Sequence, residues 1–212
     1  MKKIILITSY IEYEFDIKNS IEKDDFIICI DGGADIAMRQ CIIPDLILGD
    51  MDSVSGDIPE GIPSEKFPPE KDYTDLELAL QRSVSMGAEE VRIIGAMGGR
   101  LDHTVAAIQL LSRYSRYFSR LTMEDGRNRC FVLYGDGKPH VIKREEDAYL
   151  SLFSLSDECR GLTVSHVKYC LTDHTLSGTF PLGVSNEFSE NKKEDAVLSF
   201  REGILLVVIS GK

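Results

Sequence analysis

The chain has 212 residues and a formal net charge of −11, from 24 Lys and Arg against 35 Asp and Glu. An apolar content of 43% with 28% charged residues is ordinary for a globular protein and excludes wholesale disorder. The longest uninterrupted apolar run, residues 204–209, is far shorter than the roughly 20 residues that span a bilayer. We therefore expect a cytoplasmic protein that does not enter a membrane.

The negative charge is concentrated in the first part of the chain. Residues 1–125 carry 13 basic and 23 acidic side chains, whereas residues 126–212 carry 11 and 12. Such an acidic front half is unsuited to gripping a nucleic-acid backbone, so we expect no nucleic-acid partner. The excess fits either a solvated surface or a set of carboxylates gathered around a divalent cation.

The cysteines give no sign of a disulfide framework or a zinc ribbon. There are five, an odd number, and no two of them form a Cys-x-x-Cys pair. Cys29 lies inside the apolar run 26–30, which is typical of a small core residue.

Short apolar runs alternate with helix-like segments through the first part of the chain. The predicted strands are residues 3–8, 26–30, 45–48 and 91–94. The predicted helices are residues 34–40, 74–86 and 103–113. Residues 54–70, which hold four prolines, are predicted to be a loop. The alternation predicts an α/β domain with a parallel, Rossmann-like sheet.

The pattern changes after about residue 125, where short β-rich runs follow one another without a long helical period. These predicted strands are residues 131–134, 141–143, 149–153, 167–171, 197–200 and 204–209. Turn signals separate several of them, which favours an antiparallel β-sandwich. The polar stretch 124–129 contains Asp125-Gly126 and marks the predicted boundary between a domain of residues 1–125 and one of residues 126–212.

The first segment that could carry chemistry is Asp31-Gly32-Gly33-Ala34-Asp35, after a predicted strand and at the start of a helix. Paired glycines let the backbone approach a ligand closely, and free N–H groups at a helix start favour anions. The segment lacks the third glycine of a dinucleotide fingerprint. A tight turn between strand and helix explains it equally well.

The second segment, Gly49-Asp50-Met51-Asp52-Ser53, places two aspartates at the carboxyl end of a predicted strand. Open α/β sheets bind ligands at this edge. Carboxylates so close together repel unless they share a cation, and Mg²⁺ commonly takes one or two of them plus substrate phosphates. The alternative is a turn that uses aspartate for local hydrogen bonds.

The third segment is Lys71-Asp72-Tyr73-Thr74-Asp75-Leu76-Glu77. Thr74 and Glu77 form a capping box, so helix initiation explains part of it. It does not explain why Lys71, Asp72 and Asp75 gather at the same end, where the aspartates could face one side and the lysine could balance a phosphate.

The fourth segment, residues 95–104, contains Gly98-Gly99-Arg100-Leu101-Asp102-His103, again between a strand and a helix. Glycine N–H groups and a guanidinium suit phosphate oxygens, although a structural glycine turn is the alternative. No P-loop sequence occurs in the chain. In a parallel sheet the four segments would converge on one crevice, where carboxylates and basic groups suit a Mg²⁺-nucleoside triphosphate.

Together the four segments resemble, in order, the motifs of the thiamine pyrophosphokinase family. A fifth, Gly183-Val184-Ser185-Asn186-Glu187, resembles that family's signature in its C-terminal β domain. The resemblance implies an α/β catalytic domain joined to a β-sandwich that binds thiamine, in a homodimer with thiamine at the subunit interface. It also implies transfer of the pyrophosphoryl group of ATP to the thiamine hydroxyl, which gives thiamine diphosphate and AMP.

The resemblance also assigns roles to residues. The catalytic set would be Asp50, Asp52, Asp75 and Asp102, of which Asp50, Asp52 and Asp75 would bind Mg²⁺. The nucleotide would contact Asp31, Gly32, Gly33, Lys71, Asp72, Thr74, Arg100 and His103. Thiamine would contact Asp102, Ser185 and Asn186. Asp102 would orient the reacting hydroxyl or accept its proton.

The sequence departs from the family's pattern at two places. Asp35 stands where the family often has Asn, and residues 166–171 replace a common Gly-x-x-Tyr-Pro-Leu stretch. Neither place holds a residue that the resemblance assigns to the triphosphate or the metal, so the departures concern the thiamine contacts and the interface.

Two other functions compete with this interpretation. A strand followed by Asp-x-Asp also opens phosphatases that form an aspartyl-phosphate, although their downstream Lys and acidic pair have no clear counterpart here. A non-catalytic sensor that binds thiamine or a nucleotide is the second, and the complete set of metal-type aspartates argues against it.

Overall fold

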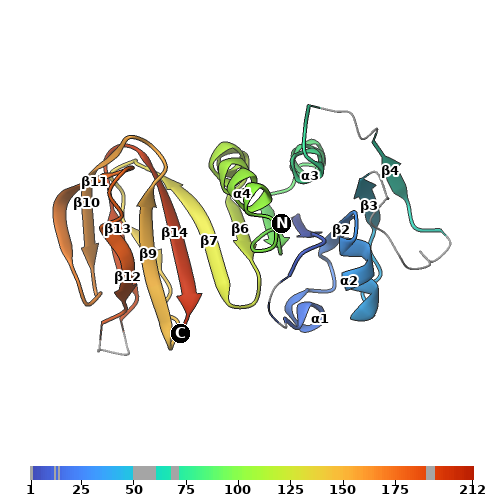
Figure 1. The fold of residues 1–212 in the computed structure, drawn as a ribbon, viewed down its shortest axis with the longest axis horizontal. Coiled ribbons are helices and arrows are strands. Elements are labelled where there is room, and N and C mark those ends of the chain that lie inside the picture. Colours follow the sequence, from blue (N-terminus) through green and yellow to red (C-terminus); the bar gives the residue numbers. More distant parts are fainter. Residues whose placement is uncertain (1, 12, 14, 50–60, 68–71, 190–193) are drawn as a thin grey trace. The chain divides into compact units, whose positions relative to one another are not determined.

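The structure is a computed structural model that describes residues 1–212 except 1, 12, 14, 50–60, 68–71 and 190–193. The chain divides into two compact units, Met1–Gly126 and Arg127–Lys212, which we call the α/β unit and the β unit (Figure 1). Among the residues described, no helix is both long and apolar enough to cross a membrane.

The α/β unit is built on a parallel sheet. Its strands are β1 (Lys3–Ile7), β2 (Phe26–Ile30), β3 (Leu46–Gly49), β4 (Ser64–Lys66), β5 (Glu90–Ile94) and β6 (Arg120–Glu124). They lie in the order β6-β5-β1-β2-β3-β4, and the pairs within this order are parallel. The four apolar residues at 4–7 of β1 are fully buried, as expected for a central strand that is covered on both faces.

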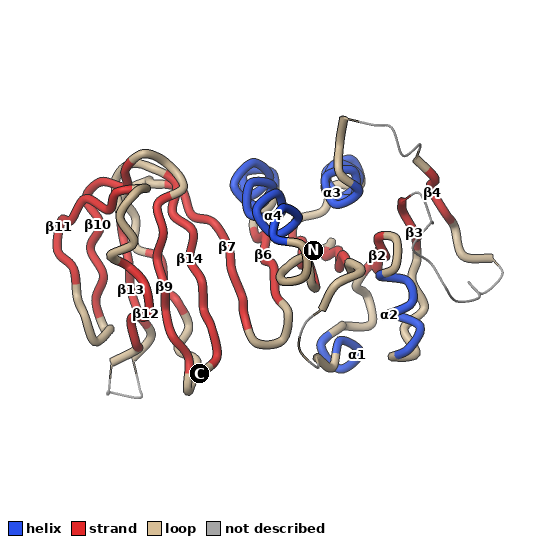
Figure 2. The backbone as a smooth tube through the Cα atoms, viewed as in Figure 1, coloured by secondary structure: helices blue, strands red, loops and turns tan. Residues whose placement is uncertain are grey.

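Helices cover both faces of this sheet. They are α1 (Ile17–Ser20), α2 (Gly33–Arg39), α3 (Asp75–Ser85) and α4 (Leu101–Tyr114), which continues into the 3₁₀ turn η1 (Ser115–Tyr117). Figure 2 shows α3 and α4 on one face and α1 and α2 on the other. One apolar core joins Ile17 of α1 and Ala34 and Ala37 of α2 to side chains of β1, β2, β3 and β5.

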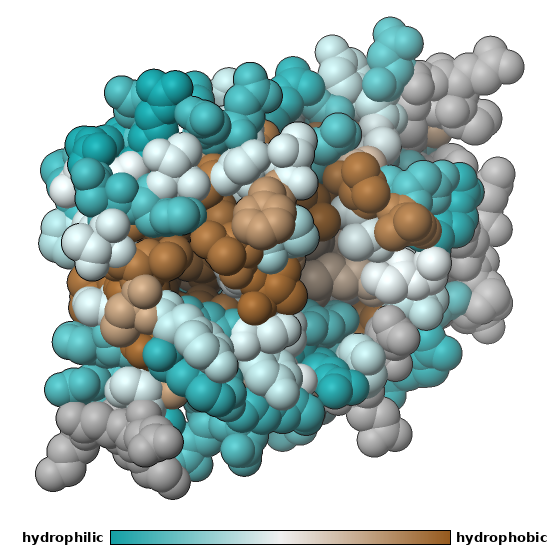
Figure 3. Space-filling view, turned by 60° about the vertical axis from the view of Figure 1, so that its left-hand side comes forward, coloured by the Kyte–Doolittle hydropathy of each residue, from teal (hydrophilic) through white to brown (hydrophobic). Residues whose placement is uncertain are grey.

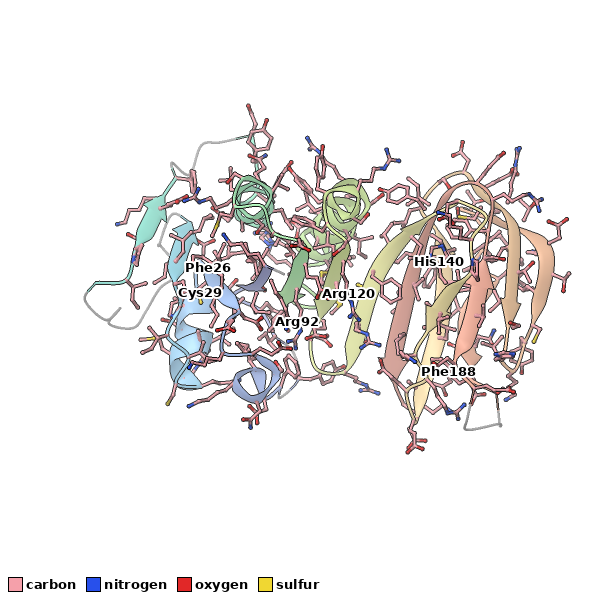
Figure 4. The ribbon with its side chains drawn as sticks, turned by 180° about the vertical axis from the view of Figure 1, so that it is seen from behind. Phe26, Cys29, Arg92, Arg120, His140 and Phe188 are labelled. Carbon is pink, nitrogen blue, oxygen red and sulfur yellow. The ribbon has the colours of Figure 1, made fainter. Side chains whose placement is uncertain are left out.

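Cys29 is part of this core, as predicted (Figure 4). Its side chain is fully buried on β2, and burial raises the pKa of its thiol to about 12. The thiol is therefore neutral at pH 7 and acts as a small apolar side chain.

The β unit consists of two antiparallel sheets around one core. Its strands are β7 (Asn128–Tyr134), β8 (His140–Ile142), β9 (Ala148–Ser154), β10 (Glu158–Ser165), β11 (Leu171–Ser177), β12 (Gly183–Glu187), β13 (Ala196–Ser199) and β14 (Ile204–Gly211). The orders are β12-β9-β14-β7 and β11-β10-β13-β8. Leu150 and Val207 of the first sheet share a core cluster with Leu162 and Leu198 of the second.

Apolar side chains also remain at the surface of the β unit. Phe180, Leu182 and Val184, at and before the start of β12, are 63%, 46% and 46% exposed. Figure 3, which turns the β unit forward, shows apolar side chains gathered on one face between hydrophilic margins. Exposed apolar patches of this kind mark contact surfaces more often than isolated apolar residues do.

Two predicted elements differ from the structure. The strand predicted at residues 167–171 is wrong: Val167 forms only an isolated bridge with Phe188, and β11 begins at Leu171. The positive φ of His166, 59°, interrupts the extended backbone just before this stretch. The predicted loop 54–70 contains the short edge strand β4.

Candidate functional site

A cavity of about 510 Å³ lies at the carboxyl ends of strands β1, β2 and β5 and beside helices α3 and α4. Ligands bind at this edge in open α/β sheets. The lining consists of Thr8, Ser9, Tyr10, Ile30, Asp31, Tyr73, Thr74, Asp75, Leu76, Ala96, Gly98, Arg100, His103, Ala106, Ala107 and Leu110. Five of the predicted site residues therefore share one cavity: Asp31, Thr74, Asp75, Arg100 and His103.

Asp31 reaches the cavity because two glycines let the backbone pack closely beside it. A Cβ on Gly49 would lie 1.7 Å from Asp31 Oδ1, and a Cβ on Gly33 would lie 2.1 Å from the carbonyl oxygen of Ile7. Asp31 itself has a φ of 47°, in the left-handed region. Gly32 and Gly33 form the start of α2 behind it and are not part of the lining.

The start of α3 presents Thr74 and Asp75 to the cavity. The side chain of Thr74 caps the helix by accepting a hydrogen bond from the Glu77 N–H (3.2 Å), as predicted. The carboxylate of Glu77, which the capping box would return to the helix start, instead accepts from Arg113 Nη1 (2.7 Å) and the Tyr114 hydroxyl (3.1 Å) of α4. Asp72 is exposed and lies outside the lining.

The glycine-rich segment after β5 follows an unusual backbone path. Gly95, Gly98 and Gly99 have φ values of 90°, 86° and 63°, and Ala96 has a φ of 60°. Non-glycine residues rarely adopt such values, so the surrounding contacts must hold this conformation. The segment leads directly to Arg100, the N-cap residue of α4.

Arg100 and Asp102 form an exposed ion pair. The guanidinium donates from Nε to Asp102 Oδ1 (3.2 Å) and from Nη2 to Asp102 Oδ2 (2.6 Å). The hydrogen bond from Arg100 lowers the pKa of Asp102, and the same bond raises the pKa of Arg100. Asp102 is therefore a carboxylate at pH 7. It lies next to Arg100 and His103 but is not itself among the residues that line the cavity.

The two predicted thiamine residues of the β unit lie on β12. Ser185 has a φ of 57°, and its N–H donates to Ser151 Oγ (3.0 Å). The Asn186 amide holds the backbone of Tyr169, because Oδ1 accepts from the Tyr169 N–H (3.0 Å) and Nδ2 donates to the Tyr169 carbonyl (2.9 Å). It thereby fixes the segment that carries the exposed ring of Tyr169.

Three predicted residues, Asp50, Asp52 and Lys71, lie outside the described residues. Of the predicted metal ligands only Asp75 is described, and within the described ranges no three His, Cys, Asp or Glu side chains gather as a metal-binding group. The donors that are described, the carboxylates of Asp31 and Asp75 in the cavity, are of the hard oxygen type that Mg²⁺ prefers.

Several lining residues were not predicted from the sequence. Thr8, Ser9 and Tyr10 follow β1 and could have been found, since they occupy the carboxyl end of a predicted parallel strand. The apolar wall of Ala106, Ala107 and Leu110 gave no signal, because its residues are ordinary for a packed helix.

Comparison with known proteins places the chain in a family. Residues 17–123 match the model described as "Thiamin pyrophosphokinase, catalytic domain", and residues 139–205 match "Thiamin pyrophosphokinase, vitamin B1 binding domain". A curated relative, the thiamine pyrophosphokinase of Bacillus subtilis, is 28% identical over 200 residues, which cover 92% of each chain.

Solved structures agree with this match. The Bacillus subtilis thiamine pyrophosphokinase structure has a TM-score of 0.88 at 24% identity and covers all of both chains. The Geobacillus thermodenitrificans thiamin pyrophosphokinase has a TM-score of 0.83 at 26% identity, and the match covers 99% of this chain and 98% of that one. The chain belongs to the thiamin pyrophosphokinase family.

Proposed function

We propose that this chain carries out its family's reaction, transfer of the pyrophosphoryl group of ATP to the hydroxyl of thiamine, with the cavity of the α/β unit as the nucleotide site. One observation carries the placement: five side chains that the sequence motifs single out line a single cavity at the carboxyl edge of a parallel sheet. Family membership and a fold shared with thiamin pyrophosphokinases support it.

In this proposal the cavity binds the triphosphate through its polar side chains. Arg100 offers a planar guanidinium that donates two parallel hydrogen bonds to phosphate oxygens, and His103 and Thr74 offer further donors. The apolar wall of α4 accommodates the base. The proposed set of nucleotide-binding residues also includes Gly32, Gly33, Lys71 and Asp72.

Asp50, Asp52 and Asp75 are proposed to hold Mg²⁺. When bound, the ion neutralises charge on the phosphates as the β-phosphorus is attacked. The proposal gains support from the acidity of residues 1–125 and from the position of Asp75 at the start of α3, inside the cavity. Asp52→Asn should abolish turnover without unfolding the chain.

Asp102 is proposed to orient the thiamine hydroxyl or to accept its proton. Its pairing with Arg100 brings the acceptor group next to the proposed phosphate-binding group, and the lowered pKa of Asp102 favours the orienting role over proton acceptance. The chemistry then depends mainly on positioning and on charge stabilisation by Arg100 and Lys71.

Thiamine is proposed to bind through Ser185 and Asn186 of the β unit, at the interface of a homodimer. The exposed apolar side chains Phe180, Leu182 and Val184 beside this strand support a surface that another subunit covers. The Rossmann-like class of the α/β unit and the β-sandwich class of the β unit belong to the same proposal. The cytoplasmic location stays a prediction.

Phosphorus NMR tests the reaction. Purified protein is incubated with ATP and Mg²⁺, with and without thiamine, and we expect AMP and thiamine diphosphate only when thiamine is present. ADP with thiamine monophosphate would mean attack at the γ-phosphorus. Phosphate released without thiamine would indicate the phosphatase, and stabilisation by ligands without turnover would indicate the sensor.

A further inference from the structure

Thr8 lies outside the sequence motifs, follows β1 and is only 8% exposed. Its hydroxyl makes two hydrogen bonds to the segment after β5. It donates to the carbonyl oxygen of Ile94 (3.2 Å) and accepts from the N–H of Ala96 (2.8 Å). The Thr8 side chain, just after β1, therefore bonds to the residues on both sides of Gly95.

The bond to Ala96 holds the backbone at a point that is costly to maintain. Ala96 has a φ of 60°, and a non-glycine residue in this region costs free energy that neighbouring contacts must offset. Gly95 has no room for a side chain here, since a Cβ would lie 2.4 Å from Thr8 Oγ1 and 2.3 Å from the Tyr10 carbonyl oxygen. The contact is thus a close packing of two backbones around one hydroxyl.

A second threonine holds the other end of the same segment. Thr104 of α4 donates from Oγ1 to the Gly98 carbonyl oxygen (3.3 Å). The segment 95–99 is therefore fixed at its entry by β1 and at its exit by α4, and Arg100 follows immediately. Any shift at the entry moves the backbone from which the guanidinium extends.

We infer that Thr8 is a positioning residue for ATP binding: its hydroxyl fixes the glycine-rich segment 95–99 and thereby sets the position of Arg100 in the cavity. The inference rests on the proposed nucleotide site. Thr8 itself lines the cavity, but both hydrogen bonds of its hydroxyl go to the backbone of Ile94 and Ala96, so we place its action on that backbone. Its removal should therefore affect the use of ATP more than the proposed thiamine contacts of the β unit.

The test compares three variants by steady-state kinetics. Thr8→Val removes the hydroxyl, Thr8→Ser keeps it, and Thr122→Val makes the same change at a threonine of β6 that is 7% exposed and outside the cavity lining. We expect Thr8→Val to lower kcat/KM for ATP by about tenfold, because the partly buried N–H of Ala96 loses its acceptor. We expect the KM for thiamine to change less than the KM for ATP, and Thr8→Ser to restore most of the loss in kcat/KM.

The outcomes separate this inference from the proposed function. A Thr8→Val protein that matches the wild type, loses only thermal stability, or is not rescued by Thr8→Ser overturns the inference while the reaction stands. A wild-type protein that neither binds Mg²⁺-ATP nor turns over overturns both. Equal losses in Thr8→Val and Thr122→Val would assign the effect to general packing and overturn the inference.

A measurement on the unaltered protein covers the case in which Thr8→Val does not fold. Hydrogen exchange of the Ala96 amide, followed by NMR, should be at least about tenfold slower than in an unstructured chain because the N–H is bonded to a buried hydroxyl. Exchange at the unprotected rate would overturn the inference.

Discussion

The two units place their polar side chains in different ways. In the α/β unit, side chains from loops after parallel strands and from two helices converge on a cavity, and glycines make room for them. In the β unit, Ser185 and Asn186 lie along a strand, and the Asn186 amide bonds to the backbone of Tyr169. The first arrangement presents functional groups to a ligand, whereas the second shapes a surface on which a ligand or another subunit can rest.

Because of this difference, we expect the two units to respond differently to substitutions. Substitutions at the cavity should act on turnover or on the close backbone packing that forms the site. Substitutions on β12 should have local and smaller effects, because one exposed strand segment changes while the core of the unit remains.

The largest expected effect is on turnover, from Asp75→Asn. The variant removes a proposed Mg²⁺ ligand from the cavity, and we expect kcat to fall by about 1,000-fold, equivalent to about 4 kcal/mol in the barrier. Asp35→Asn is the matched control, since it removes an acidic side chain from the first turn of α2. Similar kinetics for the two variants, measured by AMP formation, would contradict the role of Asp75.

The second effect is on folding, from Gly49→Ala. The new Cβ would meet Asp31 Oδ1 at 1.7 Å, and we expect the free energy of unfolding in urea to fall by about 3 kcal/mol. Gly87→Ala separates strain from collision, because Gly87 has a positive φ of 69° and no atom within 4 Å of the added Cβ. Gly87→Ala should lower the free energy of unfolding by about 1 kcal/mol. Equal losses would contradict the close approach at Asp31.

The third effect concerns the contact between α3 and α4. Glu77 is 8% exposed and accepts hydrogen bonds from Arg113 and Tyr114, so Glu77→Ala should lower the free energy of unfolding by about 2 kcal/mol. The Arg113 side chain is 63% exposed, and Arg113→Ala should therefore cost less than about 1 kcal/mol. If Arg113→Ala costs as much as Glu77→Ala, the buried carboxylate is not the main contact.

A smaller effect is expected in the β unit. Asn186→Ala removes the two bonds to the Tyr169 backbone and should lower the free energy of unfolding by about 1 kcal/mol. The Tyr169 amide should exchange faster with solvent, and the KM for thiamine should rise while the KM for ATP stays constant. A rise in the KM for ATP instead would contradict the proposal that the β unit binds thiamine and the α/β unit binds ATP.

The smallest effect is a change in the acid limb of the stability curve. Hydrogen bonds from Lys168 and Lys212 lower the pKa of Glu187 from 4.5 to about 2. A group with a depressed pKa in the folded state stabilises it above pH 4.5, and this contribution is lost as the pH falls toward 2. Urea titrations between pH 5 and 2 should show a shallower loss for Glu187→Gln than for the wild type, and identical slopes would contradict it.

The sequence predicts four of the six described strands and three of the four described helices of the α/β unit, because local patterns decide those elements, but it misses α1, β4 and β6. The strand predicted at 26–30 has the bounds of β2, since a buried apolar run lies between polar turns. The start of α3 follows from the Thr74 cap. The carboxylate of Glu77 shows the limit of such patterns, because its partner Arg113 lies 36 residues further along the chain.

The β unit is harder to predict because its strand ends depend on distant contacts. Residues 167–171 have the composition of a strand. The positive φ of His166 and the hydrogen bonds between Asn186 and Tyr169 nevertheless keep most of this stretch out of a strand. Thr8 is a similar case within the α/β unit. Its role at Ala96 depends on the pairing of β1 with β5, which a local pattern does not specify.

The most direct test of the account is to locate the nucleotide on the protein. A ¹⁵N-labelled sample would be titrated with Mg²⁺ and α,β-methylene ATP, an analogue that cannot release AMP, and the amide shifts recorded. The account predicts the largest shifts at Thr74, Ala96, Gly98 and His103, which line the cavity of the α/β unit. Shifts confined to the β unit, or none at saturating analogue, would contradict it.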